Sequence, residues 1–323
     1  MEPIIAPVDR ELIEQELTES KFLRNTNYGN RQIFMVTHHD SPNVMREIGR
    51  LREYSFRDAG GGTGKELDID EYDTARVPFK QLIVWDADDE EIIGGYRFIN
   101  LIDLPSDGKG GVKTPTAHLF RFTDTFLKDF LPTTIELGRS FIQPKYQATY
   151  DIRKGMFSLD NLWDGLGALV IENPSVKYFF GKMTMYSQYN SEARDILLHF
   201  LHKFFPDPDE MVIPLYPVPI LSDRKQLDEL FTGGTYEENY RILNHNIRLF
   251  KENIPPLFNA YMNLSPTMRF FGAAYNHGFG EVEESGILIT IRDVYDKKMS
   301  RHLASYIKKI NLRNFKLRIR RSK

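Results

Sequence analysis

Apolar and polar positions follow two different periods along the chain, and the change of period separates predicted helices from predicted strands. Apolar residues three or four apart predict helices, whereas short runs rich in Val, Ile and Phe predict strands. The predicted helices cover 7–22, 43–57, 119–131, 159–172, 190–205 and most of 227–263, and the predicted strands cover 32–36, 81–85, 92–100, 134–142, 178–185, 268–275 and 286–291. This order favours a mixed α/β sheet over repeated βαβ units.

The chain shows no repeat and no low-complexity linker, so we expect one domain over 1–296 with a helical insertion at about 207–265. Residues 297–323 differ from this body in charge. They hold eleven Lys/Arg and no Asp or Glu, which leaves 31 basic and 45 acidic residues, a net charge of −14, in 1–296.

The basic C-terminal tail has helical spacing of its apolar residues. Met299, Leu303, Tyr306, Ile307 and Ile310 fall on one helical face. A basic amphipathic helix is typical of contact with an anionic membrane or an acidic partner, and a terminal helix packed on the body explains the pattern equally well. Aromatic residues are too sparse, and the body too acidic, to favour nucleic acid as a partner.

Composition excludes several classes of protein. The 323 residues include no Cys, which excludes disulfide scaffolds, thiol nucleophiles and Cys-ligated metals. No apolar run approaches the ~18 residues of a membrane span, and the acidic first twenty residues lack the apolar stretch of a signal peptide. We therefore expect a cytoplasmic protein, with peripheral membrane contact as the option that the tail raises.

Four further motifs have ordinary structural explanations. The glycine segment 60–65 lacks the first Gly and the final Ser/Thr of a phosphate loop, and the adjacent His38 and His39 would point to opposite faces of a strand, so we expect neither a nucleotide nor a metal site. The acidic cluster 68–73 fits a solvated turn or a site for a cationic amine. Phe122, Phe126 and Phe130 recur every four residues, which favours the core over an acyl tunnel.

The most informative motif is Glu136-Leu137-Gly138-Arg139-Ser140, because its charges lie inside an apolar strand. Buried charges are costly unless they are paired or used. A bulge at Gly138 would bring Glu136 and Arg139 to one face and leave a backbone N–H free beside a carboxylate. That arrangement suits proton relay and polarisation of a carbonyl. An interior Glu–Arg pair that only holds the sheet is the alternative.

With these residues the chain resembles the GNAT-superfamily branch of ornithine-lipid and glycine-lipid N-acyltransferases, often labelled hemolysin-like. The resemblance covers most of 45–295. It is carried by 52–56 (REYSF) with 70–73, by 93–97 (IGGYR), by 136–142 (ELGRSFI) with 162–166 and 178–181, and by 255–286. It implies a GNAT-like fold, a central and mostly antiparallel sheet flanked by helices, with a basic C-terminal helix added.

The same sequence motifs are similar, more distantly, to those of acyl-homoserine-lactone synthases. Both groups move a fatty acyl chain from acyl carrier protein to an amine. The resemblance implies transfer of a 3-hydroxy fatty acyl chain to a small amino acid, with glycine favoured and ornithine next, and no bound cofactor or metal. The substrate contacts that it implies are Arg52, Phe56, Asp70, Asp73, Arg97, Arg139 and Ser140.

The chemistry that we expect is direct transfer without an acyl-enzyme. Glu136 takes a proton from the amine, the N–H at the Gly138 bulge stabilises the oxyanion, and Tyr186 or Tyr189 protonates the leaving thiolate. Arg97 and Arg139 bind the acceptor carboxylate or hold the active-site loop.

The donor is expected to be acyl carrier protein rather than acetyl-CoA. The Gly-x-Gly loop of acetyl-CoA enzymes is absent from 147–155, and Lys145 before this segment together with Arg153 and Lys154 inside it suits the acidic surface of a carrier protein. Two alternatives remain open, a signal synthase that acylates and cyclises a methionine-derived amine and a non-enzymatic membrane-active protein.

Overall fold

A computed structural model describes residues 1–323 except 107, 109–110 and 308–323. Its strands are β1 (Phe22–Asn25), β2 (Gln32–Val36), β3 (Lys80–Asp86), β4 (Glu91–Asn100), β5 (Phe120–Phe122), β6 (Thr134–Ile142), β7 (Tyr178–Met185), β8 (Val212–Pro214), β9 (Arg269–Asn276) and β10 (Val282–Thr290). Eight of them form one sheet in the order β1-β2-β3-β4-β6-β7-β10-β9, and β5 pairs with β8 separately. Within the large sheet the described pairs are antiparallel except β6 with β7.

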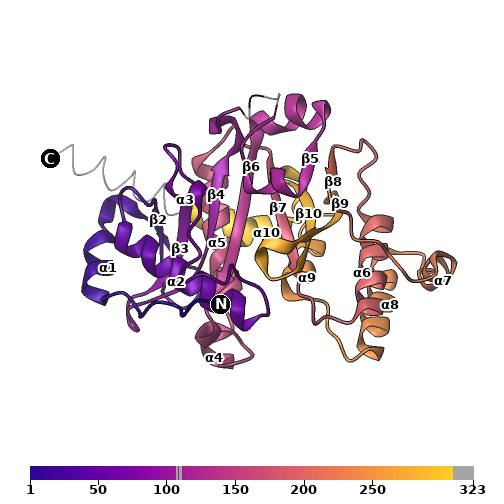
Figure 1. The fold of residues 1–323 in the computed structure, drawn as a ribbon, viewed down its shortest axis with the longest axis horizontal. Coiled ribbons are helices and arrows are strands. Elements are labelled where there is room, and N and C mark those ends of the chain that lie inside the picture. The colour runs from indigo at the N-terminus through magenta and orange to yellow at the C-terminus, as the bar shows by residue number, and fades with distance from the viewer. Residues whose placement is uncertain (107, 109–110, 308–323) are drawn as a thin grey trace.

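Helices lie on both sides of this sheet (Figure 1). They are α1 (Arg10–Glu16), α2 (Pro42–Asp58), α3 (Glu71–Thr74), α4 (Ile152–Gly155), α5 (Ser158–Glu172), α6 (Ser191–Phe204), α7 (Arg224–Leu230), α8 (Tyr236–Leu249), α9 (Pro256–Met262) and α10 (Asp296–Met299). The predicted mixed α/β sheet flanked by helices is confirmed. No helix among the described residues is long and apolar enough to cross a bilayer.

Apolar side chains point alternately to the two faces of the sheet along its strands, which explains why helices pack on both faces. On β3, Ile83 packs with α2 on one face, whereas Leu82 packs with α5 on the other. The apolar stripe of α2 and the largely apolar surface of α5 each need such a face to bury. Farther along the sheet, α6, α8 and α9 cover β7, β9 and β10 on the α5 side.

Three predicted elements differ from the structure. The predicted helix 119–131 is β5 followed by a π-helical turn at Phe126–Phe130, because the phenylalanine series stacks on itself (Phe122–Phe126 ring centroids 4.9 Å apart) and packs against β7. The predicted helix 7–22 ends at Glu16, and its last residue begins β1. The last strand begins at Val282 rather than 286, so Glu283 and Glu284 belong to it.

The start of the C-terminal tail packs on α5. After α10 the chain continues as a π-helical turn at Ser300–Ala304, and Tyr306 is buried and donates a hydrogen bond to Glu172 (2.7 Å). For this part of the tail, packing on the body is therefore the correct interpretation. Ile310 and the rest of 308–323 lie outside the described residues, and the boundary at 296 and the insertion at 207–265, which contains β8, α7, α8 and α9, stay predictions.

Candidate active site

The only parallel pair described in the large sheet creates a gap. β6 and β7 pair over three residues each, ending at Glu136 opposite Phe180. Beyond that point both strands continue without pairing to each other, and a cavity that opens to solvent lies between them. Its lining residues are Phe56, Tyr96, Arg97, Pro115, Glu136, Leu137, Gly138, Arg139, Ser140, Gly181, Lys182, Thr184, Leu257, Tyr261, Phe279 and Glu284.

A bulge in β6 faces this cavity. Arg97 of β4 pairs with Gly138 and Gly95 pairs with Phe141, so Arg139 and Ser140 together oppose the single residue Tyr96. Arg139 has a φ of 48°, in the left-handed region that non-glycine residues rarely adopt. The extra residue therefore follows the Gly138 position expected from the sequence, and both Glu136 and Arg139 reach the cavity lining.

Glu136 is 1% exposed and is held by two hydroxyl groups. Thr114 donates a short hydrogen bond to its Oε2, and Thr116 donates to its Oε1 at 2.7 Å. Lys182 Nζ in turn donates to Thr116 Oγ1 at 2.7 Å. The carboxylate is thus fixed on one side by a threonine clamp and linked through Thr116 to a lysine on the opposite wall of the gap.

Lys182 and Glu284 supply the other charges of the cavity wall. Burial lowers the pKa of Lys182, and the nearby carboxylates of Glu136 and Glu284 oppose that shift. Glu284 is 4% exposed and accepts a hydrogen bond from Thr184 at 3.1 Å. The cavity wall therefore carries one lysine amine and two carboxylates.

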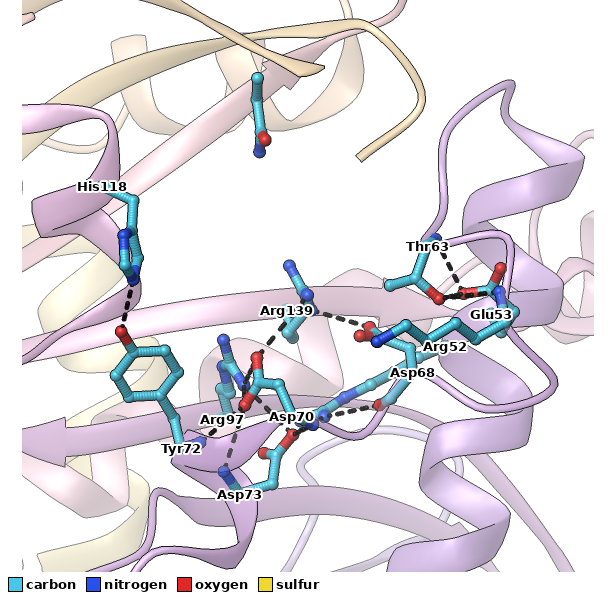
Figure 2. Close-up of polar contacts among 12 residues, drawn as sticks. Arg52, Glu53, Thr63, Asp68, Asp70, Tyr72, Asp73, Arg97, His118 and Arg139 are labelled. Atoms are coloured by element: carbon cyan, nitrogen blue, oxygen red, sulfur yellow. Dashed lines mark hydrogen bonds and ion pairs between the residues drawn. The ribbon is translucent and has the colours of Figure 1, made fainter. Parts of the chain in front are cut away.

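Arginine and aspartate side chains below the cavity form a buried ionic network (Figure 2). Arg97 Nη1 donates to both carboxylate oxygens of Asp70 at 2.8 Å and to Asp73 at 3.2 Å, and Arg52 donates to Asp73 at 3.1 Å. Asp73 is fully buried; burial opposes its ionisation, but Arg52 and Arg97 outweigh that effect and hold its pKa below the ordinary value. Asp68, Asp70 and Asp73 of the acidic cluster are thus paired with arginine side chains rather than left for an amine.

Arg139 of the β6 bulge also contacts an aspartate next to this network. Its Nε lies 2.7 Å from Asp68 Oδ2, and its guanidinium carbon lies 4.4 Å from the centre of the Phe279 ring. Phe279 in turn packs edge-on against Phe56. These contacts place the Arg139 head between an anion and an aromatic face at the cavity wall.

The glycine-rich loop 60–64 covers this corner of the site. Glu53 accepts hydrogen bonds from Thr63 N (3.0 Å), Thr63 Oγ1 (2.7 Å) and Gly64 N (2.7 Å), as Figure 2 shows for Thr63. A Cβ on Gly61 would lie 2.9 Å from the Tyr186 ring, so a side chain there would displace that ring. The loop is therefore packed on the site by a buried carboxylate.

The two tyrosines proposed as acids lie in different places. Tyr186 packs beside the loop, outside the cavity lining, and burial together with Glu284 raises its pKa to about 12. Tyr189 donates its hydroxyl to Asn253 O at 3.0 Å and lies away from the gap. Tyr261 does line the cavity and interacts with Tyr96, and burial raises its pKa well above the ordinary value.

The basic residues expected to contact a carrier protein are largely paired. Lys145 binds Glu91 at 2.8 Å, and Lys154 forms a short ion pair with Asp89. Arg153 is exposed, and within the described part of the chain it forms no ion pair. The Asp151 carboxylate accepts from the N–H groups of Arg153 (2.9 Å) and Lys154 (3.1 Å) at the start of α4.

Sequence reasoning missed the threonine clamp, Lys182, Glu284 and Tyr261. Lys182 carried a usable signal, because it is the single charged residue in the apolar strand Tyr178–Met185, the same signal that identified Glu136. Glu284 was missed because the strand was expected to begin at 286. Thr114 and Thr116 come from an irregular loop and a short 3-10 turn, which no periodicity marks.

The residues described provide no metal centre. No group of three or more His, Asp or Glu among them is placed to hold an ion. The cavity instead offers a fixed carboxylate, an ammonium group and a strand bulge, which suit proton transfer and stabilisation of an oxyanion.

Comparisons with known proteins agree with this chemistry. Residues 51–154 match the acetyltransferase (GNAT) domain family. A glycine N(alpha)-acyltransferase of Phocaeicola vulgatus is 53% identical over 308 residues, 95% of this chain and 94% of that protein. A glycine N(alpha)-acyltransferase of Bacteroides thetaiotaomicron is 54% identical over 307 residues, 95% of this chain and 91% of that protein. No solved structure matches significantly.

Proposed function

The chain belongs to the GNAT-type N-acyltransferases, and from this premise we propose that it transfers a fatty acyl chain from a thioester donor to the amino group of glycine. The observation that carries the proposal is Glu136, buried at the point where β6 and β7 stop pairing and facing the cavity beside the bulge. The names of the two relatives support glycine as the acceptor.

The proposed reaction is direct attack of the amine on the thioester. The glycine amine is an ammonium at neutral pH and loses a proton to Glu136. The neutral amine attacks the thioester carbon, and the C–S bond breaks as the amide bond forms. The nitrogen gives up one further proton, and the departing thiolate takes up one proton to become a thiol. A backbone N–H at the bulge around Gly138–Ser140 stabilises the oxyanion, and one such donor is commonly worth about 3 kcal/mol.

Charge pairing supports Lys182 as the group that binds the glycine carboxylate. Arg97 and Arg139 are already paired with Asp70 and Asp68, which favours the role of holding the active-site loop for these arginines. Arg52, Asp73 and Phe56 hold the same wall. Lys182 donates only to a neutral threonine within the described part of the chain, so its remaining N–H groups are free for an anion in the cavity.

The leaving thiolate needs a proton donor close to the gap. Tyr186 is the proposed donor, because it packs beside the loop 60–64 and its neighbour Glu284 lines the cavity. Tyr261, which lines the cavity itself, is the alternative donor.

Acyl carrier protein is the proposed donor of the chain. A CoA pyrophosphate needs a set of free backbone N–H groups, but the Asp151 carboxylate already accepts from those at the start of α4. The negative charge of Asp151 would also repel the phosphates. Arg153 remains exposed for an acidic carrier, and the donor chain is proposed to be 3-hydroxylated, with ornithine as the second acceptor to test.

A turnover assay tests the proposal directly. Purified protein is mixed with 3-hydroxyacyl–acyl carrier protein, or with the matching acyl-CoA, and a pool of free amino acids, and the products are read by mass spectrometry. N-acylglycine from the carrier protein is the expected product. A folded protein that acylates no amino acid from either donor would refute it.

A Glu136→Gln variant tests the base. The amide retains a hydrogen-bonding side chain for Thr114 and Thr116 but cannot take a proton, so kcat should fall by about 100-fold or more. Glu283→Gln is the matched control, because this carboxylate pairs with Arg194 outside the cavity lining. Full turnover by Glu136→Gln would remove Glu136 from the mechanism.

A further inference from the structure

Thr116 lies between two ionisable side chains of the cavity wall, Lys182 and Glu136. Its Oγ1 accepts a hydrogen bond from Lys182 Nζ at 2.7 Å and donates one to Glu136 Oε1 at 2.7 Å. The threonine is fully buried, and Glu136 is 1% exposed. The three side chains therefore form a continuous chain of hydrogen bonds across the gap between β6 and β7.

A hydroxyl group in this position transmits the effect of one neighbour to the other. It has one proton and two lone pairs, so a bond accepted from Lys182 leaves its proton for Glu136. The accepted bond polarises the hydroxyl and strengthens the bond that it donates. A hydrogen bond donated to a carboxylate favours the charged form and makes the carboxylate a weaker base. Lys182 therefore opposes proton uptake by Glu136 through Thr116.

The charge of Lys182 depends on the same neighbours. Burial lowers the pKa of Lys182, whereas the carboxylates of Glu136 and Glu284 favour its charged form. An anchor for the carboxylate of an acceptor must be an ammonium group. The side chain that meets this requirement is thus the one that contacts Thr116.

Thr114 contacts the same carboxylate from the other side and offers a comparison. It donates to Oε2 of Glu136, and its own oxygen accepts from Thr116 N at 3.4 Å. Within the described part of the chain it has no hydrogen bond to a lysine. Each oxygen of Glu136 keeps a second lone pair, so the carboxylate can take a proton while both threonines stay bonded.

We propose that Thr116 is a positioning residue that couples binding of the acceptor carboxylate at Lys182 to proton uptake by Glu136. This inference rests on the proposed acyl transfer and on Lys182 as the anchor. The carboxylate of glycine takes N–H groups of Lys182 and compensates its charge, which reduces the polarisation of Thr116. Glu136 then becomes a stronger base when the acceptor ammonium reaches it, and one proton passes from the acceptor nitrogen to Glu136.

This coupling predicts the class of acceptor. An amine without a carboxylate leaves Lys182 bonded to Thr116 and meets a weaker base, even at saturation. The enzyme should therefore distinguish α-amino acids from simple amines in kcat as well as in KM. An anchor that acted on binding alone would change KM only.

Kinetics with glycine and glycinamide test the coupling, because glycinamide keeps the amine and lacks the carboxylate. Comparing the ratio of the two kcat values between variants cancels the different reactivity of the two amines. Thr116→Val removes the hydroxyl and should lower the ratio of glycine to glycinamide about tenfold, the size of a lost hydrogen bond to a charged group. Thr116→Ser keeps a hydroxyl and should retain the wild-type ratio.

Thr114→Val is the matched control. It removes the other hydroxyl bound to Glu136 without removing a contact to Lys182, so it should change both kcat values alike and keep their ratio within about twofold. A wild-type ratio in Thr116→Val, or an equal fall of the ratio in Thr114→Val, would overturn the coupling.

The unmodified chain gives a second measurement that does not depend on the folding of a variant. Methylamine and formate together are the two halves of glycine. Formate bound at Lys182 should raise kcat for methylamine several-fold, whereas chloride at the same ionic strength should not. Equal rates with formate and with chloride would overturn the coupling.

The coupling and the proposed function fail in different ways. Transfer to glycine with one ratio in all variants and no activation by formate would remove the coupling and leave the function intact. A folded protein that acylates no amino acid from either donor would refute the function itself.

Discussion

At the scale of single residues, the charges near the cavity divide into two groups. Arg52, Asp73 and Arg97 neutralise one another below the cavity, and their buried pairs hold the loop in place. Lys182 and Glu136 face the cavity and are held by neutral threonines. Charge that is buried but not consumed by an ion pair is available to substrate.

Lys182→Met should therefore weaken binding of the acceptor more than chemistry. Loss of a hydrogen bond to a charged group costs about 1.5–3 kcal/mol, so KM for glycine should rise about 10- to 100-fold with a smaller change in kcat. The variant should also lose the ability to distinguish glycine from glycinamide. Lys177→Met, an exposed lysine just before the same strand, is the control, and a variant that keeps the wild-type KM for glycine would exclude the anchor role.

Asp73→Asn should destabilise the fold. The variant leaves the positive charges of Arg52 and Arg97 buried without the negative charge of Asp73. We therefore expect the free energy of unfolding to fall by about 3–5 kcal/mol. Since the pKa of Asp73 is held below its ordinary value, its contribution is present above the unfolded-state pKa of about 4 and is lost as pH falls through the folded-state pKa. Denaturant unfolding at neutral and at acid pH measures this effect. The difference in the free energy of unfolding between variant and wild type should become smaller in acid. Equal free energies of unfolding at neutral pH would contradict the prediction.

Sequence reasoning found the residues whose charge conflicts with an apolar neighbourhood. Glu136 and Arg139 stood out in an apolar strand, and both lie at the cavity. The pairing of Arg139 with Asp68 could not be predicted, because it depends on a loop that brings residues 71 positions apart together. The hydrogen bonds from Thr114 and Thr116 to Glu136 could not be predicted from the sequence for the same reason.

At the scale of elements, the close approach of β4 and β6 positions the bulge. A Cβ on Gly94 would lie 2.3 Å from Phe141 O, a backbone atom of the neighbouring strand. A glycine in a strand often marks such an approach. The Gly94-Gly95 pair, which the sequence showed only as part of a family resemblance, thus sets the spacing on which the bulge depends.

Gly94→Ala should push the two strands apart. We expect a loss of about 1–3 kcal/mol in stability, as for other overpacked sites, together with reduced turnover because the bulge moves. The melting temperature and kcat measure the two effects. Gly278→Ala is the control, since its Cβ would meet nothing closer than 3.7 Å. Unchanged stability of Gly94→Ala would show that the strands can separate without cost.

The boundaries of a helix or strand were predictable where its pattern of apolar residues stayed the same from end to end. The strands Gln32–Val36, Thr134–Ile142 and Tyr178–Met185 match the predictions to the residue. The prediction at 119–131 is wrong at 120–122, because the period of four runs from a strand into a π-helical turn, with Phe122 of β5 stacked on Phe126 of the turn. Pairing of β5 with β8, about ninety residues later, overrides the local pattern there.

At the scale of the whole molecule, charge is separated between an acidic body and a basic C-terminal end. Residues 297–307 hold three of the eleven Lys/Arg of the tail and pack on α5, so eight lie in 308–323. We propose that these eight attract an anionic membrane, each contributing up to about 1 kcal/mol near the surface.

Two truncations separate anchoring from folding. A chain ending at Ile307 should keep its melting temperature and turnover and lose binding to anionic vesicles, measured by flotation at low and high salt. A chain ending at 296 should in addition lose stability, because it removes His302 from Asp164. Unchanged flotation of the chain ending at Ile307 would exclude the membrane role of the tail.

The contact between Arg24 and His302 also has a consequence for synthesis. It joins residues 278 positions apart, near the two ends of the chain. A ribosome produces Arg24 early and must release His302 from its exit tunnel before the two can meet. The packing of Ser300–Ala304 on α5 therefore forms late in synthesis, and a nascent chain stalled before that point leaves this apolar face of α5 uncovered.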